Sequence, residues 1–295
     1  MRVAITGSSG LIGSALAESL EADGHDVVRL VRRPPRAPGE VQWDPDAGGV
    51  DLSGLAGVEG AVHLAGVGVG DRRWTESYKR RIRDSRVLGT RTLVRALSSV
   101  EPLPRVLVSG SGVHAYGDRG DEELTERSSR GDGFLAGVVR DWEAEAEAAG
   151  EAGIRVALSR TGIVLSQSGG TLGRIMPLVK LGVAGPMAGG RQWWSWVTLP
   201  DVVGALRFLL ENDVSGPVNV TAPEPARQVD VFRALASEVH RPAVMPAPRF
   251  ALRAVVGEFA DEITGSQRAT PEALLAAGFT FRHSRIADAA RWVTH

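Results

Sequence analysis

The stretch AITGSSGLIGSAL, residues 4–16, decides the fold. It begins inside an apolar strand candidate at residues 2–6 and ends inside an amphipathic helical pattern. Between them, Gly7 permits a tight turn, Gly10 lets the backbone approach a pyrophosphate, and Gly13 packs the helix against the strand. The helix N-terminus then offers free N–H groups and a favourable dipole to phosphates. An ordinary glycine turn is the less favoured interpretation, because the pattern stands between such a strand and such a helix.

Short β-branched runs alternate with helical patterns along most of the chain, which is typical of βαβ units around a parallel sheet. We expect strands at residues 2–6, 26–31, 60–65, 105–110, 155–160 and 217–221. We expect helices at residues 11–23, 75–98, 137–150 and 201–212, and a proline-rich irregular loop at residues 32–40. The predicted fold class is α/β: a Rossmann-like doubly wound parallel sheet with a smaller, mostly helical C-terminal substrate lobe.

The alternation stops at about residue 166, where a Gly-rich segment begins, and the chain after residue 222 reads as mostly helical. We therefore expect residues 1–165 to form a nucleotide-binding domain that is completed by about residues 195–222. Residues 166–194 and 223–295 would form a substrate or lid lobe over the carboxyl edge of the sheet.

Composition narrows the possible partners. The formal net charge is −1, so we expect neither nucleic acid nor an acidic membrane surface as a partner. The absence of cysteine excludes disulfides, thiolate catalysis and zinc–thiolate sites. MRVAITG enters a strand without a signal-peptide pattern, and no apolar run reaches the ~18 residues needed to span a bilayer. We expect a cytoplasmic monomer or homodimer that takes a small-molecule ligand.

The second strand candidate ends at RLVRR, residues 29–33. An NAD-binding protein would carry an acidic residue there for the ribose 2′-hydroxyl. Arg32 and Arg33 instead suit a 2′-phosphate, which guanidinium groups bind in a bidentate manner. The pair favours NADP(H) over NAD(H); a solvated basic loop is the alternative.

Longer stretches resemble successive landmarks of extended short-chain dehydrogenases/reductases: TGSSGLIGSAL (6–16), VHLAG (62–66), RVLGTRTLVRAL (86–97), SGSGVHAYGD (109–118) and PVNVTAPEPARQVDVFRAL (217–235). RRWTESYKRRIRDSRV (72–87), SRTGIVLSQSGGTLGRIMPLVKLGVAGPM (159–187), GGRQWWSWVTLPDVV (189–203) and GSQRATPEALLAAGF (265–279) resemble a narrower atypical branch. That branch is termed "epimerase family", nucleoside-diphosphate-sugar-epimerase-like or cell-division-inhibitor-related. It pairs a Rossmann-like domain with a C-terminal domain of unknown function, matched here from about residue 246.

The resemblance implies NADP(H) as cofactor and assigns residues to each of its parts. It implies roles at the pyrophosphate, adenosine phosphate and ribose for Gly7, Ser8, Ser9, Gly10, Leu11, Ile12 and Gly13, for Arg32 and Arg33, and for Leu64, Ala65 and Gly66. Near the nicotinamide it implies Ser109, Arg160, Thr161 and Gly162. Ser111 is the match to the family's catalytic serine.

Typical members of the family carry a tyrosine that exchanges a proton with the substrate oxygen and, one helical turn later, a lysine that lowers the tyrosine pKa. When WEAEAE is aligned so that Glu143 is the family's helix glutamate, these positions fall at Leu135 and Val139. The only tyrosines, Tyr78 and Tyr116, are not followed by a lysine four residues later. The standard dyad is therefore missing from the sequence.

Two residues after Ser111 could replace the dyad. His114 titrates near neutrality and Tyr116 carries a hydroxyl, and both lie in the loop where a substrate oxygen is expected. The alternative is that they are packed loop residues.

A substrate site is suggested by GGRQWWSWVTLPD, residues 189–201, which holds Arg191, Trp193, Trp194 and Trp196. Aromatic faces beside a guanidinium suit a planar or sugar-like ligand with a negative group. A hydrophobic clamp between the lobes explains the tryptophans equally well.

Three functions fit these observations. The first is an NADP(H)-dependent oxidoreductase or epimerase-like enzyme with a non-standard acid. The second is a non-catalytic NADP(H)-binding sensor or regulator, and the third is a fold kept for protein–protein contact with the cofactor as a structural ligand. We favour the first, because hydride transfer depends chiefly on how the cofactor is positioned.

Overall fold

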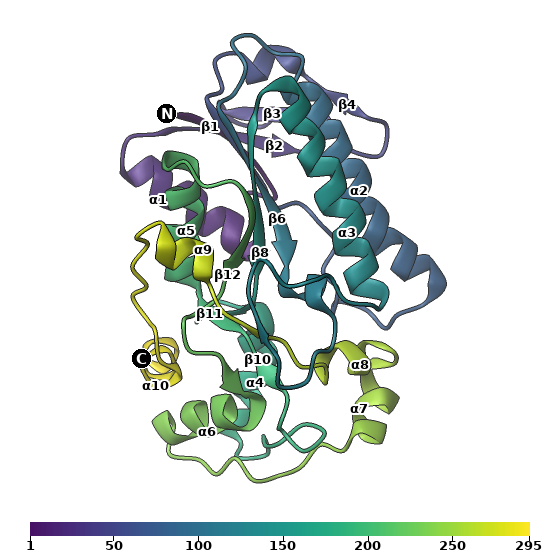
Figure 1. Cartoon of the computed structure of the whole chain (residues 1–295), viewed down its shortest axis with the longest axis vertical. Helices are drawn as coiled ribbons and strands as arrows, with labels where there is room; N and C mark the ends of the chain where they lie inside the picture. Colours follow the sequence, from purple (N-terminus) through teal and green to yellow (C-terminus); the bar gives the residue numbers. More distant parts are fainter.

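The computed structural model describes residues 1–295 and is built on an eight-stranded sheet (Figure 1). The strands follow the spatial order β12-β8-β6-β5-β1-β2-β3-β4, and every neighbouring pair is parallel except β3 with β4. Their bounds are β1 (Arg2–Thr6), β2 (Asp26–Val31), β3 (Glu40–Asp44), β4 (Gly49–Val50), β5 (Gly60–His63), β6 (Val106–Gly112), β8 (Arg155–Thr161) and β12 (Gly216–Val220). The predicted Rossmann-like α/β fold is confirmed.

Helices cover both faces of the sheet. On one face lie α1 (Leu11–Ala22) and α5 (Leu199–Glu211), and on the other lie α2 (Glu76–Leu97) and α3 (Phe134–Glu147) (Figure 1). Side chains of a strand alternate between faces, so Val3 and Ile5 of β1 join the core under α1 and α5, whereas Ala4 joins the core under α2. A strand buried on both faces must be apolar throughout, which is why RVAIT is recognisable in the sequence.

The six expected strands are all present, with ends within two residues of the expected ones. Two strands of this sheet were not predicted: β3 starts at Glu40, the last residue of the expected proline-rich loop, and β4 pairs with it at the sheet edge. The helix expected at 137–150 spans 134–147 and continues as a 3₁₀ turn (Ala148–Ala152). The helix expected at 201–212 begins at Leu199, which places Asp201 inside its first turn.

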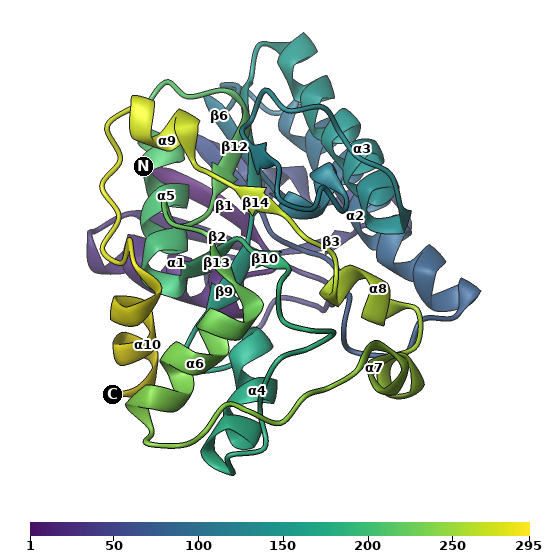
Figure 2. The ribbon, with the colours of Figure 1, turned by 60° about the horizontal axis from the view of Figure 1, so that its bottom comes forward.

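The remaining elements lie at the carboxyl edge of the sheet (Figures 1 and 2). They comprise the helices α4 (Gly170–Lys180), α6 (Gln228–Glu238), α7 (Arg249–Val256), α8 (Phe259–Ile263) and α10 (Ile286–Thr294). Three two-stranded ribbons join them: β9 (Ile163–Leu165) with β11 (Trp196–Thr198), β10 (Trp193–Trp194) with β13 (Ala226–Arg227), and β7 (Glu123–Leu124) with β14 (Arg268–Ala269). None of the helices is both long and apolar enough to cross a membrane.

The segment between α8 and α10 packs partly on the sheet instead of on these helices. Leu274 of α9 (Glu272–Ala276) and Phe281 pack in the same core as Val3 and Ile5 of the sheet. The carboxylate of Asp201 also holds this segment, because it accepts hydrogen bonds from the backbone N–H groups of Arg282 and His283 at 2.7 and 3.1 Å. The segment 223–295 therefore contributes both to the C-terminal lobe and to the core of the sheet.

Candidate cofactor and active site

The turn between β1 and α1 is packed too tightly for side chains at two of its glycines. Gly7 has φ +69°, and a Cβ there would lie 2.8 Å from the carbonyl carbon of Leu64. A Cβ on Gly13 would lie 2.2 Å from the carbonyl oxygen of Gly7. Gly10 is the N-cap of α1 and no side chain caps the helix. The N–H groups of the first turn, in Leu11, Ile12 and Gly13, thus remain for a ligand.

The exposed tip of the turn is polar: Ser9 is exposed and Ser8 half-buried. Together with the free helix N-terminus, this is a backbone cradle for an anionic group, as the glycine spacing predicts. The residues that the structure brings to the cradle fit a pyrophosphate.

Thr6 fixes the neighbouring loop, a role that only its place directly before Gly7 could have indicated in the sequence. Its Oγ1 accepts hydrogen bonds from the N–H groups of Leu64 (3.1 Å) and Ala65 (3.2 Å). It also lies 2.7 Å from Nδ1 of the buried His63. The loop that holds Leu64, Ala65 and Gly66 is thereby held against Gly7, where the resemblance implies the ribose.

The two arginines at the end of β2 differ in their surroundings. Arg33 donates two hydrogen bonds to the carboxylate of Glu40, at 2.7 and 2.6 Å, and this pair lowers the pKa of Glu40 to about 2. Arg32 is exposed and makes no ion pair. The guanidinium of Arg32 could therefore bind a phosphate, whereas that of Arg33 is already paired with Glu40.

Glu143 of α3 is buried and surrounded by donors. Ser111 Oγ donates to it at 2.6 Å, Arg160 donates through Nε and Nη2 at 2.8 Å each, and Arg130 donates at 2.7 Å. Burial acts to raise the pKa of this carboxyl, but the hydrogen bonds and charge of Arg160 outweigh it and lower the pKa. Glu143 is therefore held as a carboxylate that orients Ser111 and Arg160.

Tyr116 lies on the other side of Arg160. Its hydroxyl donates to Asn219 Oδ1 at 2.7 Å and accepts from Arg160 Nη1 at 3.1 Å, and the side chain is fully buried. Burial raises the pKa of Tyr116. Tyr116 and Arg160 thus share one buried network with Glu143.

His114 has different surroundings from Tyr116. It is half-buried, its ring makes no hydrogen bond, and burial together with the charge of Arg86 lowers its pKa to about 4. The half-buried Ser111 lies nearby on the same strand-to-turn segment, whereas Ser109 is fully buried and its Oγ donates to the carbonyl of Gly110 at 3.2 Å.

Arg86 of α2 is a charged side chain at this edge that sequence reasoning did not single out. It donates to the carbonyl oxygens of Val67 (3.0 Å) and Ile82 (3.1 Å), and its guanidinium lies 5.3 Å from the ring centroid of Trp142. A Cβ on Gly66 would lie 3.2 Å from the guanidinium carbon. Burial lowers the pKa of Arg86 to about 10, so it carries its charge at neutral pH.

Thr161 and Gly162, which were also expected near the nicotinamide, lie at the end of β8 and directly after it. Thr161 Oγ1 donates within the strand to the carbonyl of Ser159 at 3.2 Å. Gly162 packs against the backbone of Ser195, and its N–H donates to Val220 at 3.1 Å. Leu135 and Val139, the positions at which we expect the family's tyrosine and lysine, are buried on α3.

The four candidate substrate residues divide into two pairs. Trp194 and Trp196 are buried in the core of the C-terminal lobe, Trp194 at 5.8 Å from the ring of Phe232. Trp193 is half-buried, with the guanidinium groups of Arg227 and Arg268 at 4.1 and 4.8 Å from its ring, and Arg191 is exposed. Only Trp193 and Arg191 have surface that a ligand could contact.

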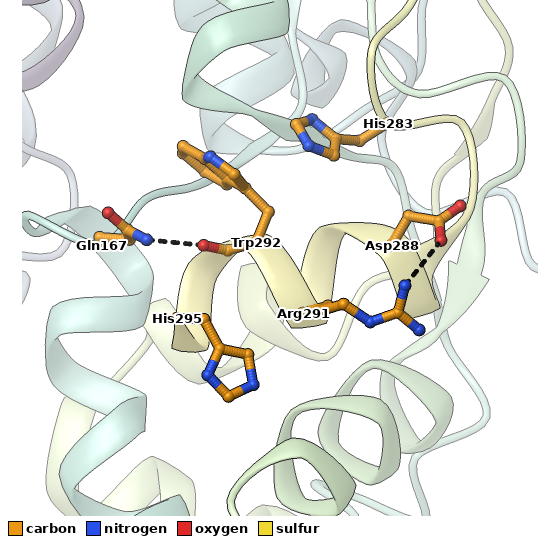
Figure 3. A pocket seen from close by; sticks show the side chains of 6 residues that line it. All are labelled: Gln167, His283, Asp288, Arg291, Trp292 and His295. Carbon is orange, nitrogen blue, oxygen red and sulfur yellow. Dashed lines mark hydrogen bonds and ion pairs between the residues drawn. The ribbon is translucent and has the colours of Figure 1, made fainter.

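A separate pocket of about 530 Å³ lies along α10 (Figure 3). In it Gln167 donates to the carbonyl of Trp292 at 2.6 Å, and Arg291 pairs with Asp288 at 3.9 Å. It contains none of the residues predicted for the cofactor or the chemistry.

Known proteins match this chain along most of its length. The model of the NAD dependent epimerase/dehydratase family matches residues 3–221, and a domain of unknown function (DUF1731) matches residues 247–293. The epimerase family protein MT2273 of Mycobacterium tuberculosis is 42% identical over 99% of this chain and 97% of its own length. The human epimerase family protein SDR39U1 is 33% identical, over 98% of each chain.

Solved structures extend the comparison. The crystal structure of human SDR39U1 (isoform 2) with NADPH has a TM-score of 0.92 at 31% identity, over 99% of both chains. The nucleoside-diphosphate sugar epimerase from Corynebacterium glutamicum has a TM-score of 0.80 at 37% identity, over 98% of this chain and 57% of that one. The chain therefore belongs to the NAD dependent epimerase/dehydratase family, in the group of epimerase family proteins that carry the DUF1731 domain at the C-terminus.

Proposed function

We propose that the protein is an NADP(H)-dependent oxidoreductase or epimerase-like enzyme that acts on a small molecule without the tyrosine–lysine dyad. The observation that carries the proposal is the cradle at Gly7–Gly13, where Cβ atoms would collide with backbone and the N-terminus of α1 has no cap. The nicotinamide would supply or accept the hydride, and the chain would bind and orient it.

The preference for the 2′-phosphorylated cofactor is supported by Arg32. Its guanidinium is exposed at the end of β2, without the ion pair that occupies Arg33. The NADPH in the solved human relative points the same way. A guanidinium can make two charge-assisted hydrogen bonds to the 2′-phosphate of NADP(H). The 2′-hydroxyl of NAD(H) is neutral and cannot make these bonds.

The proton-transfer group that we propose is His114. Ser111, whose hydroxyl hydrogen is donated to Glu143, would serve beside it as a hydrogen-bond acceptor for a substrate hydroxyl. His114 is half-buried and its ring has no partner, so both its nitrogens are free to meet a ligand. Its lowered pKa makes it neutral at pH 7, the state in which imidazole accepts a proton. Tyr116 is the weaker candidate, because its hydroxyl is engaged by Asn219 and Arg160.

Calorimetric titration with NADPH, NADP, NADH and NAD tests the cofactor. We expect the phosphorylated pair to bind more tightly, and Arg32→Ala to lose about tenfold or more in NADPH affinity, since a hydrogen bond to a charged group contributes ~1.5–3 kcal/mol. Arg33→Ala is the matched control and should lose much less. Equal affinities for NADPH and NADH, or equal losses in the two variants, would contradict the assignment of Arg32.

Following NADPH absorbance with a panel of aldehydes, ketones and quinones tests for turnover. If turnover is found, His114→Ala should reduce kcat by a factor of ~10²–10⁴, the usual contribution of a general acid or base. Turnover that survives His114→Ala together with Ser111→Ala would rule out our proton-transfer group.

A non-catalytic NADP(H)-binding sensor is a second candidate, favoured by one observation. The buried network commits Tyr116, Arg160 and Glu143 to one another, which makes this edge a rigid frame. Tight NADPH binding without oxidation of NADPH by any compound in the panel would favour the sensor.

A further inference from the structure

Arg86 is a half-buried cation without an anion to balance it. It makes no ion pair, and its hydrogen bonds go to the carbonyl oxygens of Val67 and Ile82 through one nitrogen, Nη1. The same α2 helix offers a contrast, because Arg83 pairs with Asp141 and Arg91 with Glu145 across the α2–α3 surface. A charge that is partly removed from water and has no ion-pair partner is costly, and an anionic ligand would reduce this cost.

The side chains next to Arg86 have hydrogen-bond donors that lack an acceptor. Two buried nitrogens near it have no hydrogen-bond partner, Nε2 of His63 and Nε1 of Trp142. Trp142 stacks on the guanidinium, and burial together with a smaller effect from the charge of Arg86 lowers the pKa of both His63 and His114. Since Trp142 Nε1 and the guanidinium can only donate, the deficit in this region is of acceptor atoms.

Topology says which part of a cofactor would meet this region. In the sheet order, β2 with Arg32 lies on one side of β1 and its phosphate cradle, and β5 and β6 lie on the other side. Gly66, in the loop that follows β5, is exposed and lies against the Arg86 guanidinium. A dinucleotide whose adenosine phosphate is at Arg32 and whose pyrophosphate is at Gly7 therefore extends its nicotinamide half toward Arg86.

We propose that Arg86 is a cofactor-binding residue whose guanidinium holds the oxygen atoms of the nicotinamide nucleotide half of NADP(H). The inference rests on the proposed function, since it takes the cofactor site as given. Typical family members have a lysine at the position of Val139 on α3. Arg86 would supply the missing positive charge from α2, close to the neutral imidazole of His114. Arg86 thereby sets where the nicotinamide lies relative to Ser111 and His114.

The experiment compares two ligands, NADPH and adenosine 2′,5′-bisphosphate, which lacks the nicotinamide half. In calorimetry, Arg86→Met should weaken NADPH about tenfold or more and leave the bisphosphate affinity unchanged. Arg86→Lys, which keeps the charge but loses the fork of donors, should fall between wild type and Arg86→Met. Arg83→Met, on the outer surface of the same helix, should leave both affinities unchanged.

Thermal unfolding separates binding from folding. If Arg86→Met does not fold, Arg86→Lys carries the comparison, through the ratio of its NADPH and bisphosphate affinities to those of wild type. Unchanged NADPH affinity, or equal losses for both ligands, would overturn the role of Arg86. Wild-type protein that binds neither ligand would instead refute the cofactor assignment, and this inference with it.

Discussion

At the scale of single residues, His63 and Thr6 show how the loop at Leu64 and Ala65 is held against the Gly7 turn. Thr6 Oγ1 accepts from two backbone N–H groups, of Leu64 and Ala65, so its own hydrogen is left for Nδ1 of His63. The imidazole proton then lies on Nε2, the atom that has no partner. A neutral His63 in one tautomer thus fixes the loop against which Gly7 packs.

This neutrality makes stability depend on pH. Burial, with a smaller effect from the charge of Arg86, lowers the pKa of His63 in the folded protein to about 3, against a value near 6.5 when unfolded. Between these values the unfolded chain binds a proton that the folded protein does not. The free energy of unfolding therefore decreases as pH falls from about 6.5, by at most ~1.4 kcal/mol per pH unit for this group.

Urea unfolding between pH 7 and pH 5 measures this slope. His63→Gln should have a smaller slope than wild type, with the remainder coming from His114, whose lowered pKa acts in the same direction. The carboxyl of Glu143 does not disturb the comparison, because its lowered pKa acts only at more acidic pH. His240→Gln, on the exposed surface, is the control. A slope that is the same in His63→Gln and wild type would show that His63 titrates in the folded protein.

At the scale of elements, the register of the sheet brings together polar side chains that lie far apart in the sequence. Ser111 of β6 is the Cα partner of Arg160 of β8, and Arg160 is the partner of Asn219 of β12. Three neighbouring strands therefore bring these side chains into one row, which Glu143 of α3 and Tyr116 complete. The row lies near the carboxyl ends of β6, β8 and β12, the edge of the sheet at which we expect the nicotinamide.

The sequence predicts the elements with a strong period and misses those that depend on contacts. The central strands and the Gly7–Gly13 turn are recognisable because burial on both faces and close packing restrict their residues. The strand β3 follows several prolines and lies near the sheet edge, with only Val41 and Trp43 buried. The network around Arg160 could not be read from spacing, because Tyr116 and Asn219 are 103 residues apart and meet only through the register.

The turn before α1 gives a prediction at this scale. Gly13→Ala should destabilise the fold by about 1–3 kcal/mol or more and abolish NADPH binding, because its Cβ would lie 2.2 Å from the carbonyl oxygen of Gly7. Gly150→Ala is the matched control: it lies in a 3₁₀ turn with no atom within 4 Å of the added Cβ, so stability should change by less than about 1 kcal/mol. Chemical unfolding and calorimetry measure both. A stable Gly13→Ala protein that still binds NADPH would remove the tight turn from the mechanism.

At the scale of the whole molecule, the C-terminal lobe is fastened in two ways. The α7–α8 pair, which lies at one side of the lobe (Figure 2), contacts the sheet domain through an ion pair and a small aromatic cluster: Lys79 lies 2.8 Å from Glu258, and the ring of Phe259 lies 5.4 Å from that of Trp74. The segment 272–283 is instead inserted into the core of the sheet through Leu274 and Phe281, before α10 returns to the core of the lobe. The first attachment can loosen without unfolding the sheet, but the second cannot.

The two attachments predict different responses to truncation of a side chain. Leu274→Ala should lower the free energy of unfolding by about 2–5 kcal/mol, because Leu274 is fully buried among residues of β1, β12 and α5. Phe250→Ala, on α7 with 77% of its surface exposed, should change it by less than about 0.5 kcal/mol. Circular dichroism and hydrogen exchange would follow the transitions. Because Leu274 connects the end of the chain to the nucleotide-binding sheet, we expect Leu274→Ala to shift one common transition to lower temperature. Separate melting of residues 223–295, with the sheet unaffected, would mean that the segment folds as an independent lobe.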